Sequence, residues 1–159
     1  MKPPEISERK IKSITQNRKA RHDYEIMQTI ETGILLVGTE VKSLRAGKCS
    51  IQDAYANFPY DNYELFLINF HINPYDHGNR QNHEPLRQRK LLVNQREAVK
   101  LKIGVQEKGL TLIPLSLYFS GQFVKVELAL VRAKKKYDKR ETVKERDSDR
   151  EIRRKYRYK

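Results

Sequence analysis

The sequence is poor in cysteine, tryptophan and long hydrophobic runs, and these shortages exclude several classes of protein. The only cysteine, Cys49, cannot form an internal disulfide, which favours a reducing compartment such as the cytoplasm. No unbroken apolar run exceeds four residues, whereas a transmembrane helix needs roughly 20. Residues 1–5 lack the apolar segment of a secretory signal. We therefore expect a cytoplasmic protein with no membrane span.

Patterns typical of metal binding and covalent catalysis are also missing. The four histidines lack the spacing of a zinc site, and Cys49 has no second cysteine to complete one. No Gly-Lys-Ser/Thr follows Gly33 or Gly38, which excludes a phosphate-binding P-loop. The paired acids Asp147 and Asp149 lie in a highly charged segment where both should be solvated. We therefore expect no metal, no cofactor and no enzymatic activity.

Acidic residues are fewer than basic ones, and the imbalance is confined to the two ends of the chain. The sequence has 33 Lys and Arg against 20 Asp and Glu, a net charge of +13. Residues 132–159 carry +8 of this charge, residues 1–21 carry +5, and residues 22–131 sum to zero. Basic side chains displace counterions from phosphates and so favour a polyanion partner. The distribution predicts a globular domain over 22–131 between a basic N-terminal arm and a basic C-terminal tail.

The central region alternates between short apolar segments and turn residues. Short runs of alternating or continuous apolar residues predict six short strands, at 24–30, 34–37, 54–58, 63–70, 110–119 and 124–130. We expect the first two to form a hairpin over 22–38 that turns at Thr32-Gly33, and the last two to turn at 120–122. Pro114 should disturb its strand with an edge or a bulge. Six short strands favour a mainly β fold, an antiparallel barrel of the OB type.

Two helices and one long loop complete this prediction. A helix over 40–46 is expected to follow the N-cap Thr39, with Val41 and Leu44 facing the core. A second helix over about 95–107 should follow the N-cap Asn94. Residues 71–90 lack periodicity and should form a polar loop. The inner face of the second helix is expected to contain Val99 and Ile103.

Three basic segments are candidates for contact with RNA. The first combines cations with groups that can bond to or stack on bases: Asn17, Arg18, Lys19, Arg21, His22 and Tyr24. The second is the outer face of the helix at 40–46 and the residue after its stop: Lys42, Arg45 and Lys48. The third is the C-terminal tail. The alternatives are a solubilising lead-in for the first segment and an ordinary solvated helix face for the second.

The tail cannot form a core of its own, so we expect it to be disordered when free. However, residues 132–159 contain no Gly or Pro, and acids precede bases at helical spacing, as in Glu141–Lys144 and Asp149–Arg153. The tail should therefore become helical on a surface, where 138–159 would span about 33 Å. The alternatives are a charged tail that never orders and, with less support from its few apolar residues, a lipid-binding tail.

Five blocks of the sequence, in this order and spacing, resemble the SmpB family, which binds transfer-messenger RNA (tmRNA) in bacterial ribosome rescue. The resemblance runs from about residue 15 to the end. It implies an OB-like barrel, binding to the tRNA-like domain of the RNA in place of an anticodon stem, and a tail that folds in the empty messenger channel of a stalled ribosome. It also implies a monomer that meets an elongation factor through the aminoacylated RNA. The blocks are 18–24, 40–48, 89–97, 115–119 and 135–140.

The resemblance also assigns roles to individual residues. Those at positions that the family uses for the RNA are Asn17, Glu31, Leu92 and Lys125. Two positions depart from the pattern, because Ala133 stands where many members have Gly and Tyr137 where some have His. The start of the tail should contact the ribosome through Lys134, Lys135, Tyr137, Asp138, Lys139 and Arg140.

Two functions of other classes remain open at this point. A general RNA-binding OB protein of the ribosome or the initiation machinery would explain the basic ends but not the five blocks. An RNA-modifying or RNA-cleaving enzyme would need titratable groups gathered in one cleft, whereas those of 22–131 are scattered along the sequence.

Overall fold

The computed structural model describes residues 10–134 and 136–156, with the backbone alone at 79, 136–139, 141–142 and 155–156. Its helices are α1 (Arg18–Asp23), α2 (Gly38–Arg45), α3 (Gln95–Gln106) and α4 (Lys136–Tyr156), with a short 3-10 helix, η1 (Asn79–Gln81). Its strands are β1 (Ile11–Gln16), β2 (Tyr24–Ile34), β3 (Cys49–Ser50), β4 (Tyr55–Asn57), β5 (Leu65–Ile68), β6 (His71–Ile72), β7 (Arg89–Leu92), β8 (Thr111–Ser120) and β9 (Phe123–Ala133).

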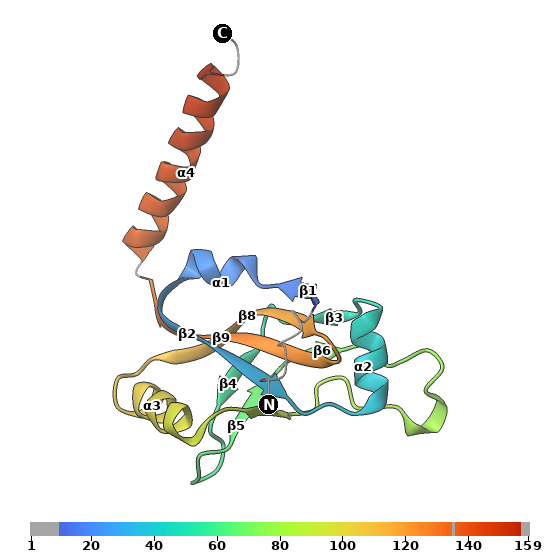
Figure 1. Ribbon diagram of the computed structural model, residues 1–159. Coiled ribbons are helices and arrows are strands. Elements are labelled where there is room, and N and C mark those ends of the chain that lie inside the picture. Colours follow the sequence, from blue (N-terminus) through green and yellow to red (C-terminus); the bar gives the residue numbers. More distant parts are fainter. Residues whose placement is uncertain (1–9, 135, 157–159) are drawn as a thin grey trace, which may run out of the picture.

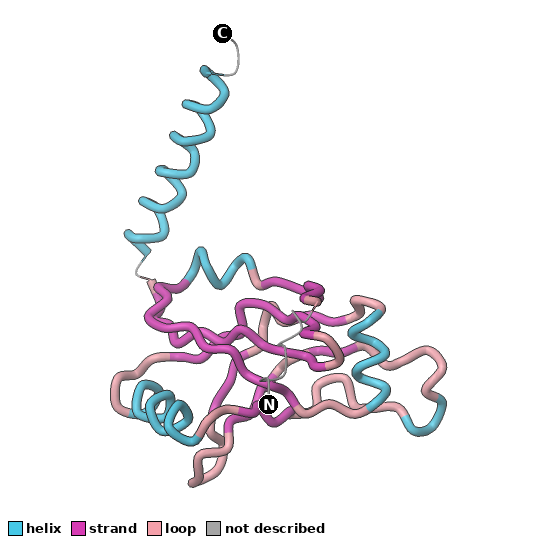
Figure 2. The backbone as a smooth tube through the Cα atoms, viewed as in Figure 1, coloured by secondary structure: helices cyan, strands magenta, loops and turns pink. Residues whose placement is uncertain are grey.

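Six of these strands close into an antiparallel barrel. The order around the ring is β8, β4, β5, β7, β2 and β9, and β9 pairs back with β8. Strand β1 adds to the other edge of β8, while β3 and β6 form a separate two-stranded sheet. Figures 1 and 2 show the strands as a curved central body with α2 and α3 at opposite ends. The predicted six-stranded antiparallel barrel is confirmed.

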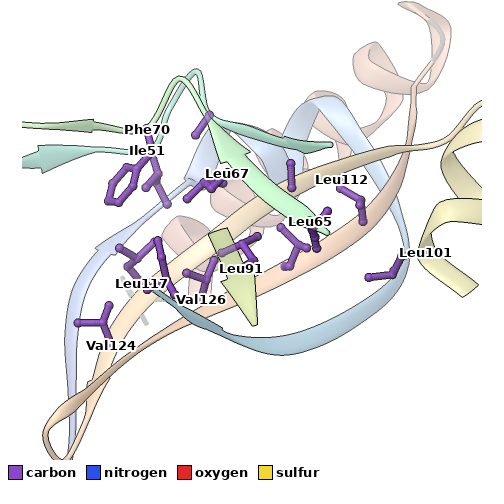
Figure 3. Packing of buried hydrophobic residues seen from close by; sticks show 14 of the residues in the cluster. Ile51, Leu65, Leu67, Phe70, Leu91, Leu101, Leu112, Leu117, Val124 and Val126 are labelled. Carbon is purple, nitrogen blue, oxygen red and sulfur yellow. The ribbon is translucent and has the colours of Figure 1, made fainter. Parts of the chain in front are cut away.

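The barrel interior is filled by aliphatic and aromatic side chains that alternate with outward residues along each strand. Figure 3 shows side chains from β5, β7, β8 and β9 converging inside the ring. Leu65, Leu67, Leu117 and Val126 have no exposed surface. Full burial of such a side chain stabilises the folded state by roughly 1.5–3 kcal/mol, so these residues fix the positions of the strands.

A second apolar cluster lies outside the barrel, under α1. Ala20 of α1 packs there with outward residues of β8 and β9, including Ile113, Ala129 and Val131. The register of β8 against β9 shifts between Pro114 and Ser116, as the expected disturbance at Pro114 predicted. Strands β8 and β9 are therefore buried on both faces at one end, whereas their outer face is partly exposed at the other.

The expected hairpin over 22–38 is wrong, because β2 runs without a turn from Tyr24 to Ile34. Gly33 is not a turn residue but sits beside Leu92 of β7 in the ladder. A Cβ atom at Gly33 would lie 3.3 Å from the Cβ of Leu92, so glycine gives the Leu92 side chain the room that it occupies. The close approach of two strands, not a change of direction, explains this glycine.

The sequence prediction missed four strands, namely β1, β3, β6 and β7. Residues 11–16 are not only part of a basic arm, since β1 pairs with β8 from Ile11 to Gln16. The expected polar loop over 71–90 is interrupted by β6 and η1, and it ends in β7. Strand β7 takes the barrel position expected for 34–37. It was missed because its inward-facing Arg89 breaks the apolar alternation that marks a strand.

The two predicted barrel helices are present, but their caps and packed faces differ from expectation. The N-cap of α2 is Val37, not Thr39, and its backbone N–H donates to Glu40 Oε2 at 2.9 Å. Asn94 is the N-cap of α3, as predicted, but its side chain makes no capping hydrogen bond. The buried face of α3 contains Ala98, Leu101 and Gly104, whereas Ile103 is exposed.

Gly104 explains which face of α3 packs. A Cβ atom at this position would lie 2.9 Å from a terminal carbon of Leu130 in β9, so glycine lets the helix approach the barrel closely. Gly104 therefore faces the barrel together with Ala98 and Leu101, and Ile103 lies on the exposed side of the helix.

Helix α4 leaves the barrel after β9 and projects away from it, as Figure 1 shows. It begins two residues before the helix expected at 138–159, and its side chains from 143 to 154 are all exposed. Residues 157–159 lie outside the described residues. At 1.5 Å per residue, its 21 residues span roughly 31 Å.

Candidate RNA-binding surface

A row of outward-facing residues crosses four neighbouring strands of the barrel. Leu92 of β7 is opposite Gly33 of β2, which is opposite Lys125 of β9, which is opposite Tyr118 of β8. Lys125 lies between the buried residues Val124 and Val126, so it faces outward as the alternation predicted. An apolar side chain, a cation and a phenol thus share one stretch of the outer surface, which we name the outer-face row.

Glu31, two residues before Gly33 on β2, belongs to the same surface. Its Oε2 accepts a hydrogen bond from the Tyr118 hydroxyl, and its Oε1 lies 3.8 Å from Lys125 Nζ. Partial burial and the nearby Glu31 carboxylate raise the pKa of Tyr118 above its usual range, so this hydroxyl stays protonated and donates. The structure therefore brings together Glu31, Leu92 and Lys125, which lie far apart in the sequence.

A second carboxylate on this face is also paired. Glu127 is opposite Glu31 in the β2–β9 ladder. It accepts a hydrogen bond from Ser116 Oγ at 2.9 Å, and Arg21 Nη2 of α1 lies 3.9 Å from it. Arg21 and Lys125 thus balance the negative charges of Glu127 and Glu31, respectively. Through Arg21, the surface extends from the outer-face row onto α1, which contacts α4.

Helix α1 presents three of the predicted RNA-binding cations to solvent. Arg18, Lys19 and Arg21 are exposed, while Ala20 is buried against the barrel. Asn17 is 5% exposed and acts as the N-cap, because its Oδ1 accepts from the Ala20 N–H at 3.1 Å. Its backbone N–H donates to the Leu115 carbonyl at 2.8 Å. The Asn17 side chain therefore holds α1 in place, and the expected base contact by this amide does not fit its burial.

The last two predicted residues of this segment are partly covered. His22 Nδ1 lies 2.9 Å from Asp23 Oδ1, and the ring is only partly exposed. Tyr24 packs against the cluster under α1, which reduces the ring surface that a base could stack on. Both residues are partly exposed, at the junction between α1 and β2.

The cations of the second predicted segment lie on or just after α2, at the end of the barrel away from α4 (Figure 1). Lys42 and Arg45 are exposed as predicted, while Leu44 is buried and Val41 is partly buried. Lys48 is exposed but pairs with Asp76 at 2.7 Å. Hydrogen bonding and the charge of Lys48 lower the pKa of Asp76. Lys42 and Arg45 thus form a second basic surface, on a different element from the outer-face row.

A buried ion pair fixes α2 to the barrel. Glu40 and Arg89 both have fully buried side chains, and Arg89 Nε donates to Glu40 Oε1 at 2.7 Å. Arg89 Nη1 also donates to the Phe70 carbonyl at 2.6 Å, and the Arg87 guanidinium binds Glu40 Oε2 at 2.8 Å. Burial alone would raise the pKa of Glu40. The hydrogen bonds from Arg87 and Val37 and the charge of Arg89 outweigh burial and lower it.

The residues predicted to contact the ribosome follow β9 directly. The Lys134 backbone N–H donates to the Asp23 carbonyl at 3.1 Å, so this residue is still attached to the barrel. Lys135 lies outside the described residues, and Arg140 is exposed. Tyr137, Asp138 and Lys139 begin α4, and their side chains also lie outside the described part of the chain.

Tyr118 and Glu127 were missed as members of the surface, although the sequence carried a signal for both. The predicted turn at 120–122 corresponds to a two-residue hairpin loop that pairs Ser120 with Phe123. Counting back from this loop places Tyr118 opposite Lys125. The buried Glu40–Arg89 pair had no such signal, because its partners are 49 residues apart.

The described residues contain no group of three or more His, Cys, Asp or Glu side chains that could hold a metal ion. Burial raises the pKa of the Cys49 thiol to about 11, which keeps it protonated at neutral pH. Within the part of the chain that the structure describes, no helix is long and apolar enough to span a bilayer. The chemistry visible at the surface is that of charged and stacking contacts.

Comparison with known families gives a match over nearly the whole chain. The family model described as SmpB protein matches residues 14–158. The chain belongs to the SmpB family. The match includes the second half of β1, the outer-face row, α2 and all described residues of α4, so every surface described above lies within the family match.

Named members of the SmpB family are similar over most of their length. The "SsrA-binding protein" of Carboxydothermus hydrogenoformans is 54% identical over 89% of this chain and 93% of the relative. That of Moorella thermoacetica is 55% identical over 91% and 92%, respectively. A chain from a solved structure described as "tmRNA-SmpB: a journey to the center of the bacterial ribosome" is 47% identical, with a TM-score of 0.64 over 81% of this chain and 93% of that one.

Proposed function

We propose that this protein binds tmRNA, also called SsrA RNA, through its tRNA-like domain and delivers it to stalled ribosomes for trans-translation. The observation that carries the proposal is the similarity to SsrA-binding proteins over almost the entire chain. The outer-face row supplies suitable chemistry, because it combines Lys125 for a phosphate, Leu92 for an apolar contact and Glu31 for base N–H donors.

The barrel and the tail have separate tasks in this proposal. The barrel, 22–131, holds the RNA and stands in for the missing anticodon stem, with the exposed cations of α1 contributing phosphate contacts. The part of the tail that follows β9 occupies the empty messenger channel near the decoding centre, where α4 contacts ribosomal RNA. The described side chains of α4 from 143 to 154 are exposed and include five Lys and Arg residues, which suit a channel lined by phosphates.

The protein acts by positioning and makes or breaks no bond. It works in the bacterial cytoplasm as a monomer, without a cofactor, and meets an elongation factor through the aminoacylated RNA. The raised pKa of the Cys49 thiol keeps this side chain protonated, so it is not activated as a nucleophile. Incubation of the purified protein with tmRNA should therefore leave the RNA intact, as measured by gel electrophoresis.

Sequencing the RNA that copurifies with the tagged full-length chain tests the proposal. We expect one abundant small RNA with the sequence of tmRNA, together with ribosomal RNA when stalled ribosomes are retained. Enrichment of ribosomal RNA alone, under conditions that release the protein from ribosomes, would contradict tmRNA binding. It would favour a general RNA-binding protein of the ribosome instead.

A further inference from the structure

A cavity of about 560 Å³ opens between the start of α2 and the segment 73–88. Figure 1 shows these two elements at the end of the barrel opposite α4. The walls of the cavity include the cations Lys42 and Arg87 and the rings of Tyr75 and His77. No Asp or Glu is among the described residues that line it. The cavity, which we name the α2 pocket, is therefore both basic and aromatic.

The two rings of the α2 pocket lie close to each other and to Lys42. The rings of Tyr75 and His77 meet edge to face, with centroids 5.5 Å apart and an interplanar angle of 73°, and Lys42 Nζ lies over the Tyr75 ring at 5.3 Å from its centroid. Tyr75 is held in place because Asn82 bonds both its backbone N–H and its carbonyl, at 3.0 and 2.7 Å. These hydrogen bonds fix the loop that carries the Tyr75 ring, so the aromatic surface is already formed before a ligand binds.

The buried ion pair behind α2 sets the charge of the pocket wall. Glu40 accepts from Arg87 and from Arg89, so these three groups together carry one positive charge. Lys42 adds a second positive charge that no carboxylate of the described residues neutralises within salt-bridge distance, whereas nearby Lys48 is already paired with Asp76. Arg87 is the member of the trio that reaches the pocket, and its side chain is 38% exposed.

A basic cavity with stacking rings matches the two parts of a nucleotide, a flat base and a phosphate. We propose that the α2 pocket binds one unstacked nucleotide of RNA, with the base against Tyr75 and His77 and the phosphate at Lys42. This inference rests on the proposed function for the presence of an RNA partner. The pocket is separate from the outer-face row, so it gives the barrel a second contact, either elsewhere on tmRNA or on ribosomal RNA.

The chain contains no tryptophan, so the Tyr75→Trp variant carries a single fluorescent reporter inside the pocket. The full-length variant is titrated with the tRNA-like domain of tmRNA and, separately, with small ribosomal subunits. Anisotropy of a dye on the RNA reports binding in the same samples. We expect tryptophan quenching that follows the binding curve in one of the two titrations, and this titration identifies the source of the nucleotide. Tyr60→Trp, at an exposed position between β4 and β5, is the matched control and should show no quenching.

His77→Trp gives a second reading from an exposed wall of the same pocket if Tyr75→Trp does not fold. Tyr75→Ala should weaken the interaction identified by quenching roughly 5- to 100-fold, the range for loss of one base-stacking contact. RNA binding by anisotropy without quenching at either position would overturn the pocket and leave the proposed function standing. Loss of all RNA binding by the unmodified chain would overturn both. Quenching by a peptide or protein of the ribosome, with no effect of isolated RNA, would also overturn the assignment.

Discussion

The barrel and α4 contain the same kinds of charged residue in opposite environments. The barrel pairs its charges and buries some of them completely, as with Glu40 and Arg89. The side chains of α4 from 143 to 154 are exposed, and even the apolar Val143 and Ile152 are 42% and 51% exposed. The barrel thus has a structure that its own core determines, whereas α4 has no comparable packed face along this stretch.

This difference indicates where each part obtains its stability. A single polar helix is marginal in water, because local ion pairs of a few tenths of a kcal/mol barely offset the cost of nucleation. Packing normally supplies the remainder, and along α4 that packing has to come from a partner. We therefore expect the barrel to bind RNA as a preformed surface and α4 to gain stability only on the ribosome.

The largest effect is expected from breaking α4 in its middle. Val143→Pro removes a backbone donor and costs about 3 kcal/mol in a helix interior. It should abolish most peptide tagging on stalled ribosomes and leave tmRNA binding unchanged, as measured by a tagging assay and by RNA anisotropy. Val143→Ala keeps the helix and is the matched control. Normal tagging by the proline variant would mean that the tail works as an extended polycation.

A smaller but still large effect is expected from breaking the buried pair. Glu40→Ala leaves Arg89 buried without its main partner and should lower the free energy of unfolding by about 3–5 kcal/mol, as measured by urea denaturation. Glu64→Ala removes the exposed partner of Lys90 and should leave the urea midpoint unchanged. Equal effects of the two substitutions would contradict the contrast between buried and exposed pairs.

The same pair predicts a dependence of stability on pH. Because the pKa of Glu40 is lowered on folding, its ionised form stabilises the folded state above its ordinary pKa of 4.5. This contribution is lost as the pH falls through the lower folded-state value. The stability difference between the natural chain and Glu40→Gln should therefore be constant near neutral pH and shrink below pH 4.5. A stability difference that grows as the pH falls would contradict a lowered pKa of Glu40 in the folded state.

The smallest effects are expected on the outer-face row. Lys125→Ala should weaken tmRNA binding by roughly 1–2 kcal/mol, about 5- to 30-fold in Kd. It should also make the plot of log binding constant against log salt concentration less steep by about one unit, the value for one lost phosphate contact. Glu31→Ala should weaken binding by an amount that persists at high salt, because its contacts are hydrogen bonds. Since these residues touch each other, the double variant should lose less than the sum. Lys108→Ala, at an exposed lysine after α3, is the control.

The predictions that succeeded concern local patterns, and those that failed depend on distant partners. The β8–β9 hairpin was predicted because its alternation and turn lie within one stretch of sequence. Strand β7 was missed because Arg89 looks like a surface residue until Glu40 is placed beside it. Gly33 was predicted as a turn because its neighbour Leu92 lies 59 residues further along the chain. The α2 pocket likewise joins residues from two segments that no local pattern connects.

The division of labour between barrel and tail is tested most directly by removing residues 135–159. The truncated chain and the full chain are compared for Kd with the tRNA-like domain of tmRNA and for peptide tagging on the same stalled ribosomes. We predict that binding to the isolated RNA is nearly retained, apart from nonspecific charge attraction that disappears at moderate salt, while tagging falls to background. Loss of specific RNA binding together with the tail, or tagging that survives without it, would contradict the account.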